Sequence, residues 1–153
     1  MVMRRGVRCG IWLAAVSLGC GVSPAGEDPG DGPAPGGDLT GGVLATFVVS
    51  GEQFRVWVTN TQTIVQILDL RDGTSLATIP NGALRVGPGP GDHNSPWSWH
   101  LDPEDIQMAE LAIEVCDGRP SLVDSMLDQY LALGRFCPWG AVLVAVEDRR
   151  QAP

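Results

Sequence analysis

The pattern of apolar positions predicts a pair of β-strands near the start of the folded part of the chain. Residues 43–49 form a continuous apolar run rich in β-branched side chains, whereas residues 53–59 alternate between apolar and polar positions. Ser50 and Gly51, between the two runs, favour a tight turn. Three apolar residues of the second run share one face: Phe54, Val56 and Val58. We therefore expect a β-hairpin that buries this face.

Two later segments have apolar side chains at the three- and four-residue spacing of a helix. Residues 61–71 follow Asn60, a favoured N-cap residue. Residues 121–133 are followed by Gly134, which suits the end of a helix. Each helix would bury one apolar stripe, and we expect both helices to pack on the same face of a sheet.

The remaining apolar stretches are short and predict strands separated by turns. We expect strands at residues 83–86, 97–101, 109–116 and 140–147. Residues 79–82 have the composition of a turn, and Asp102 with Pro103 favours one helical turn. The last strand is apolar on both faces, which is typical of a central strand. The predicted order is β-β-α-β-β-β-α-β. This is an α+β fold class, a small single domain with an antiparallel or mixed sheet.

The N-terminal part of the chain has a composition that predicts export. Residues 1–19 combine a basic start with an apolar run far shorter than the ~20 residues of a membrane span, as in a signal peptide. Gly19-Cys20 resembles a bacterial lipobox, which predicts lipidation of Cys20; ordinary signal cleavage nearby is the alternative. Residues 20–42 are rich in Gly, Pro and Asp and predict a disordered tether. The globular domain is then residues 43–150.

These features predict where the protein lies. We expect it to be exported, and either anchored by lipid in a bacterial cell envelope or secreted. Acyl chains on Cys20 would make the membrane surface one of its partners, without any spanning segment.

The charge of the domain limits its other partners. Residues 43–150 hold seven arginines and fourteen carboxylates, and the chain contains no lysine. An acidic domain without a basic cluster repels phosphate backbones, so nucleic acid is not an expected partner. The lack of lysine excludes Schiff-base chemistry. No motif points to a cofactor, and none is expected.

Two cysteines remain in the predicted domain, Cys116 and Cys137. In an exported domain such a pair favours a disulfide, because the compartment is oxidising. A metal site that includes a histidine is the alternative, but the two cysteines lack the close spacing of a zinc motif. We expect the disulfide.

The stretch "HNSPWSWHLDP" contains both histidines of the chain and two of its tryptophans. The candidate ligand-facing residues are His93, Asn94, Trp97, Trp99, His100 and Trp57. Trp97 and Trp99 would share one face of the predicted strand 97–101. Tryptophan beside polar groups often forms a platform for sugar or protein ligands. The alternative is that the rings fill the core. Trp57 opposes the apolar face of its strand and is either exposed or covered by a helix.

Five separated strings occur in the order of one known family: "VTNTQTI", "IPNG", "HNSPWSWHLDPEDIQMAE", "IEVCDG" and "CPW". Over about residues 44–148 the chain resembles the "BP-seventy-four-like N-terminal domain", a family of small exported domains of bacterial and fungal sequences. Thr61 departs from the family, in which proline often follows the asparagine. The resemblance implies the domain boundaries and export, and it implies no reaction, ligand or catalytic residue.

Three functions are compatible with these features. The first is a lipid-anchored, non-enzymatic domain that binds a glycan, peptide or protein. The second is a small metal-dependent enzyme that uses His93, His100 and nearby carboxylates. Those carboxylates are Asp92, Asp102, Glu104 and Asp105. The third is a secreted inhibitor that acts through the loop of residues 87–96. We favour the first, because no nucleophile motif or regular metal-ligand spacing occurs.

Overall fold

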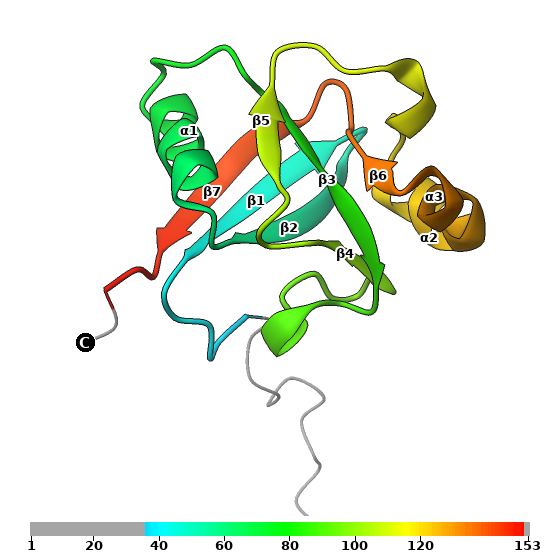
Figure 1. The fold of residues 1–153 in the computed structure, drawn as a ribbon, viewed down its shortest axis with the longest axis horizontal. Coiled ribbons are helices and arrows are strands. Elements are labelled where there is room, and N and C mark those ends of the chain that lie inside the picture. The colour runs from blue at the N-terminus through cyan, green and yellow to red at the C-terminus, as the bar shows by residue number, and fades with distance from the viewer. Residues whose placement is uncertain (1–35, 152–153) are drawn as a thin grey trace, which may run out of the picture. The chain divides into compact units, whose positions relative to one another are not determined.

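The computed structural model describes residues 36–151 (Figure 1). The predicted signal peptide, Cys20 and most of the predicted tether lie outside the described residues. Residues 36–42, predicted as the end of the tether, instead contact the domain. The Gly36 N–H donates to the Gly91 carbonyl (2.6 Å) and the Gly41 N–H to the Arg149 carbonyl (2.7 Å). The tether as predicted therefore extends too far toward the domain.

The predicted hairpin is present. Strands β1 (Val43–Val49) and β2 (Glu52–Val58) pair in antiparallel fashion, with Phe47 opposite Phe54. Ser50 and Gly51 connect them with φ angles of 52° and 79°. Positive φ at both central residues is the geometry that matches the twist of paired strands. Strand β7 (Val142–Asp148) pairs with the other side of β1, which gives the order β2-β1-β7.

A second antiparallel sheet faces the first. It consists of β3 (Ile79–Val86), β4 (Trp99–Leu101), β5 (Gln107–Ala109) and β6 (Arg135–Phe136). Strand β3 pairs with each of the other three along successive parts of its length. The α+β class is confirmed, and the strands divide between two sheets.

The helices are α1 (Thr61–Arg71), α2 (Pro120–Ser125) and α3 (Leu127–Leu133). Asn60 caps α1 as predicted, because its side chain accepts hydrogen bonds from the backbone of Gln62 and Thr63. The second predicted helix is broken at Met126 (φ −122°) and ends at the left-handed Gly134 (φ 78°). Figure 1 shows α1 and the α2–α3 pair at opposite ends of the domain, not side by side on one face. None of the described helices is both long and apolar enough to cross a membrane.

The core lies between the two sheets. The face of the hairpin that carries Phe54, Val56 and Val58 is buried as predicted. Its aromatic centre joins the two layers: the Trp99 and Phe136 ring centroids lie 5.1 Å apart, and those of Phe54 and Phe136 lie 5.8 Å apart. Burial of these rings is the main favourable contribution to folding.

The strand predicted at residues 109–116 is wrong. Strand β5 ends at Ala109, which pairs with Ile79, the first residue of β3. No backbone of β3 remains opposite the following residues, so their alternation has no partner to pair with. Leu111, Ile113 and Val115 are instead exposed by 87, 69 and 61%.

Residues 79–82 form the first half of β3 instead of the predicted turn. Asn81 pairs with Gln107, and its side-chain oxygen accepts a hydrogen bond from Arg135 Nε (2.8 Å). Gly82 pairs with Phe136. Pairing with both β5 and β6 keeps the backbone extended despite its turn-like composition.

Candidate functional site

The loop of residues 87–98 packs against the free edge of β2. The Asn94 side chain accepts a hydrogen bond from the Arg55 backbone N–H (2.8 Å) and donates one to the Trp99 carbonyl (2.8 Å). Asn94 is fully buried and therefore links the two sheets in place of a strand. Of the predicted ligand-facing residues, Asn94 is thus occupied inside the fold.

Trp97 and Trp99 do not form a common platform. The predicted strand begins only at Trp99, so the two rings do not alternate on one face. Trp99 is fully buried in the core, and its Nε1–H points to the Pro120 carbonyl (3.4 Å). Trp97 is half-buried, and its Nε1–H donates to the Gln53 carbonyl (2.8 Å) at the edge of β2. Each indole is bonded to a backbone carbonyl.

Trp57 is buried, with 4% of its surface exposed. It lies close to the backbone of Gly42, where an added Cβ would be 2.7 Å from the Trp57 ring. The residues just before β1, and not one of the helices, therefore contact it. Gly42 is needed for this close approach.

The two histidine rings lie near each other, with centroids 5.9 Å apart. Each uses Nδ1 to bond a backbone carbonyl: His93 bonds Pro90 (3.0 Å) and His100 bonds Gly87 (2.7 Å). A carbonyl only accepts, so Nδ1 carries the proton in both rings. His93 is fully buried, and its Nε2 has no hydrogen-bond partner in the described part of the chain.

The carboxylates near the histidines are committed to other partners. Asp102 pairs with Arg85 (2.8 Å), and Asp105 pairs with Arg135 (2.7 Å). The Glu104 backbone N–H and the Arg85 guanidinium hold the pKa of Asp102 below its usual range. Across residues 36–151 no three His, Cys, Asp or Glu side chains are placed to hold a metal ion. The six predicted metal-ligand candidates are thus not brought together.

We predict that acid destabilises the protein through His93. Burial lowers the pKa of His93 to about 4 from the usual 6.5; the nearby charges of His100 and Arg55 lower it further, and Asp92 opposes them. In the unfolded chain the ring binds its proton near pH 6.5, before the folded chain does. Stability is therefore lost as the pH falls from about 6.5 to 4, by on the order of 1 kcal/mol per pH unit.

The measurement is denaturant unfolding of the wild type and His93→Gln across this pH range. The wild type should lose stability more steeply than the variant. Parallel curves would show that His93 stays neutral in both states or is charged in both.

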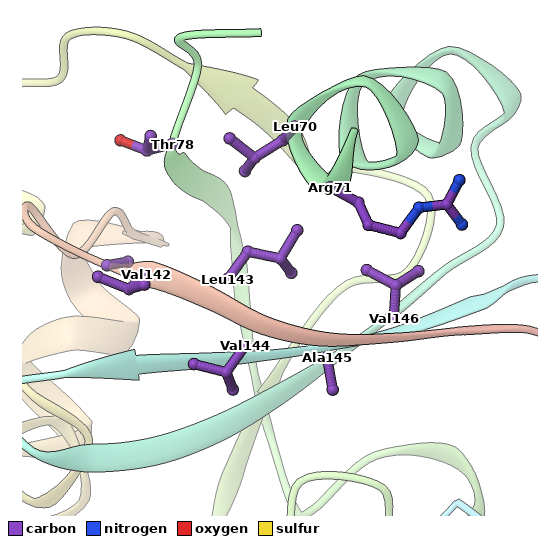
Figure 2. Close-up of a pocket in the computed structure, with 9 residues that line it drawn as sticks. Leu70, Arg71, Thr78, Val142, Leu143, Val144, Ala145 and Val146 are labelled. Atoms are coloured by element: carbon purple, nitrogen blue, oxygen red, sulfur yellow. The ribbon is translucent and has the colours of Figure 1, made fainter. Parts of the chain in front are cut away.

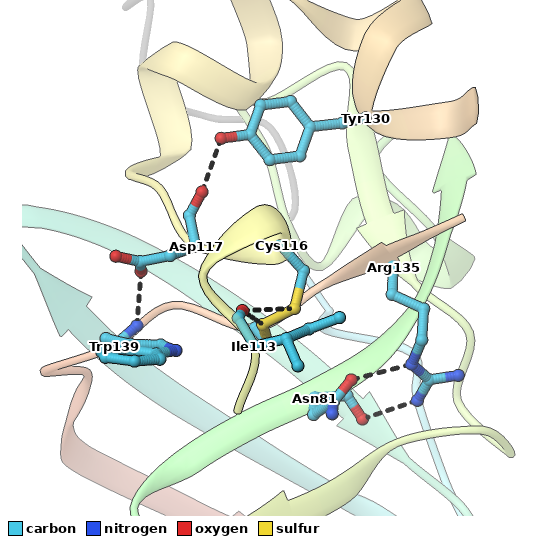
Figure 3. Close-up of a disulfide and its surroundings, with 8 residues drawn as sticks. Asn81, Ile113, Cys116, Asp117, Tyr130, Arg135 and Trp139 are labelled. Atoms are coloured by element: carbon cyan, nitrogen blue, oxygen red, sulfur yellow. Dashed lines mark hydrogen bonds between the residues drawn. A yellow bond between two sulfur atoms is a disulfide. The ribbon is translucent and has the colours of Figure 1, made fainter. Parts of the chain in front are cut away.

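The predicted disulfide between Cys116 and Cys137 is present, with the two Cα atoms 5.2 Å apart (Figure 3). The Cys137 N–H also donates to the Cys116 carbonyl (2.8 Å). Next to it, Asp117 accepts hydrogen bonds from the Tyr130 hydroxyl at its carbonyl (2.7 Å) and from the Trp139 N–H at its carboxylate (2.6 Å). This cluster attaches α3 and the approach to β7 to the disulfide.

Strand β7 was predicted to be central and is instead at the edge of its sheet. Val142 and Val144 are 59 and 53% exposed. A groove of about 360 Å³ runs between β7 and α1 (Figure 2). Sequence reasoning missed this surface because apolar residues on both faces predict burial. The exposed edge is a second candidate site, distinct from the histidine loop.

Together these observations define a small, disulfide-bonded α+β domain of two facing antiparallel sheets. Its described residues hold no assembled metal cluster, and its most apolar open surface is a strand edge. The chain belongs to the BP-seventy-four N-terminal domain family, whose model matches residues 43–150. This confirms the resemblance predicted from the five strings. No curated protein and no solved structure is significantly similar to the chain.

Proposed function

We propose that the protein is an exported, lipid-anchored, non-enzymatic domain that binds a protein or peptide partner. One observation carries the proposal: exposed aliphatic side chains gather on β7 and on the loop after β5, whereas the polar candidates are bonded within the fold. The aliphatic residues are Val142, Val144, Leu111, Ile113 and Val115. Exposed apolar surface of this kind is typical of protein interaction sites.

The contacts of the aromatic residues support a protein or peptide ligand over a glycan. A glycan platform needs an accessible ring face beside polar groups. Trp57 and Trp99 are buried, and the Trp97 indole N–H is bonded to Gln53. Trp139 is the remaining tryptophan of the domain. It is 39% exposed, and its backbone N–H is bonded to Asp117 next to the disulfide (Figure 3).

The anchor follows from the N-terminal sequence. A basic start, a short apolar run and Gly19-Cys20 favour lipidation of Cys20, and the composition of the next residues favours a tether. A tethered domain meets partners in the envelope at a raised effective concentration, so even a weak site is useful there.

Two measurements on intact cells test this function. An alkyne-labelled fatty acid should label the wild type and not Cys20→Ser, and the variant should leave the membrane fraction. Cys9→Ser is the matched control, because Cys9 lies within the predicted signal peptide. Labelling of Cys20→Ser at the wild-type level would overturn the anchor.

Chemical crosslinking in the same cells tests the binding role. The anchored wild type should give a discrete crosslinked species with a protein. If the only species formed is with a glycan, or if no species forms at any expression level, the proposed protein-binding function is wrong.

A further inference from the structure

The outer edge of β7 has backbone groups free to pair. Among the described strands, β7 pairs with β1 alone, from Val43 opposite Asp148 to Val48 opposite Val142. Its other edge therefore presents N–H and C=O groups that no described strand satisfies. A strand edge that is long, apolar and without lysine or proline is a template for pairing with another extended chain.

The groove lies along this edge. Six consecutive residues of β7 and its approach line it, from Ala141 to Val146. Because successive side chains of a strand point to opposite faces, a groove lined by all of them follows the edge and not one face. Leu70 and Arg71 of α1 form the other wall, and Figure 2 shows them above Leu143 and Val146. A strand edge beside a helix offers backbone pairing and a side-chain pocket together.

The edge does not suit pairing with a second copy of itself. The register of β7 against β1 shifts between Thr46 and Phe47, which leaves Val144 as an extra residue. In an antiparallel pair of two β7 strands, the two irregular positions would meet near the centre of the ladder. Bulges are a common device against such edge-to-edge pairing. The occupant is therefore a segment of a different sequence.

The charge of the groove describes that segment further. Arg71 is the only charged side chain among those that line the groove. Its Nε and Nη2 bond Asp72 (2.7 and 3.1 Å), and its Nη1 makes no hydrogen bond within the described residues. A second carboxylate can therefore approach Arg71. Since β7 continues past Val146 to Asp148, the added strand need not end at Arg71, and the carboxylate is that of a side chain.

We propose that the groove between α1 and the outer edge of β7 binds an extended apolar segment of a partner protein, which adds a strand to β7 and places an aspartate or glutamate beside Arg71. This inference rests on the proposed function and names its binding site. Backbone pairing supplies affinity, Val142, Val144 and Leu70 select β-branched side chains, and Arg71 selects the acid.

The test uses the purified protein and a library of short peptides blocked at both ends. The peptides carry apolar residues at alternate positions and Asp, Asn or Lys at one flank. Fluorescence anisotropy should select apolar peptides with the aspartate. Val144→Glu should weaken binding at least about tenfold, whereas Val86→Glu, the same change at an exposed position of β3, should not. Val142→Glu serves as the second variant if Val144→Glu does not fold.

Two further comparisons separate the parts of the proposal. Methylation of alternate peptide nitrogens should abolish binding, because it removes the ladder hydrogen bonds. Arg71→Gln should reduce the preference for aspartate over asparagine, whereas Arg85→Gln, which breaks an exposed ion pair with Asp102, should not.

Several results would overturn the inference. These are no selected peptide, equal loss in Val144→Glu and Val86→Glu, or binding that tolerates every methylated nitrogen. A free C-terminal carboxylate that replaces the aspartate without loss would overturn the assignment to a side chain. If these tests fail while the crosslinked protein still forms in cells, the partner binds elsewhere and the proposed function stands.

Discussion

Replacement of Trp99 by alanine is expected to cost about 3–5 kcal/mol of folding free energy. Trp99 is fully buried, and its ring centroid lies 5.1 Å from that of Phe136 and 6.1 Å from that of Phe54. Removal of the ring leaves a cavity where the two sheets meet, and neighbours held in paired strands cannot close it.

Chemical denaturation measures this loss, with Trp139→Ala as the matched control. Trp139 is partly exposed, so its removal should cost less than about 1 kcal/mol. A loss for Trp99→Ala no larger than for Trp139→Ala would mean that Trp99 does not hold the sheets together.

The second large effect is expected from the disulfide. Cys116 and Cys137 are 21 residues apart, and a crosslink over such a loop contributes about 3 kcal/mol in the loop-entropy model. The double variant Cys116→Ala with Cys137→Ala should lose this amount. The residues between the two cysteines include α2 and α3, so their attachment to the sheets should weaken first.

Denaturation of the wild type with and without a reductant is the independent measurement. The reduced wild type should unfold at the same denaturant concentration as the double variant, within the small cost of the lost sulfurs. Identical curves for the oxidised and reduced wild type would contradict the prediction.

The parts of the fold that were predictable are those where local signals agree with tertiary contacts. The alternation in β2, the turn at Ser50-Gly51 and the cap at Asn60 depend on neighbours in sequence, and all three are confirmed. The disulfide was predictable because only two cysteines remain in the domain. In these places sequence pattern and structure point the same way.

The failures share one physical cause, which is that a strand needs a partner. The alternating residues 109–116 are not a strand, because β3 ends opposite Ala109. The turn-like residues 79–82 are a strand, because β5 and β6 pair with them. Neither result can be read from the residues themselves.

The candidate site was displaced for a related reason. Residue types in "HNSPWSWHLDP" suggested ligand chemistry, but whether Asn94 or Trp99 faces a ligand or the core depends on distant residues. Arg55 lies 39 positions before Asn94 and takes its side-chain oxygen. The groove on β7 was missed because an apolar strand is predicted to be central unless its place in the sheet is known.

The pairing of β1 with β7 has a consequence for how the chain acquires its fold. The central strand of the first sheet is the first to be synthesised, and one of its two neighbours is the last, with Val43 opposite Asp148. Such non-local pairing slows folding, because a long loop must close before the contact forms. A ribosome or a translocation channel that still holds the C-terminal residues therefore leaves β1 open on one side. The sheet can be completed only after the chain has been released.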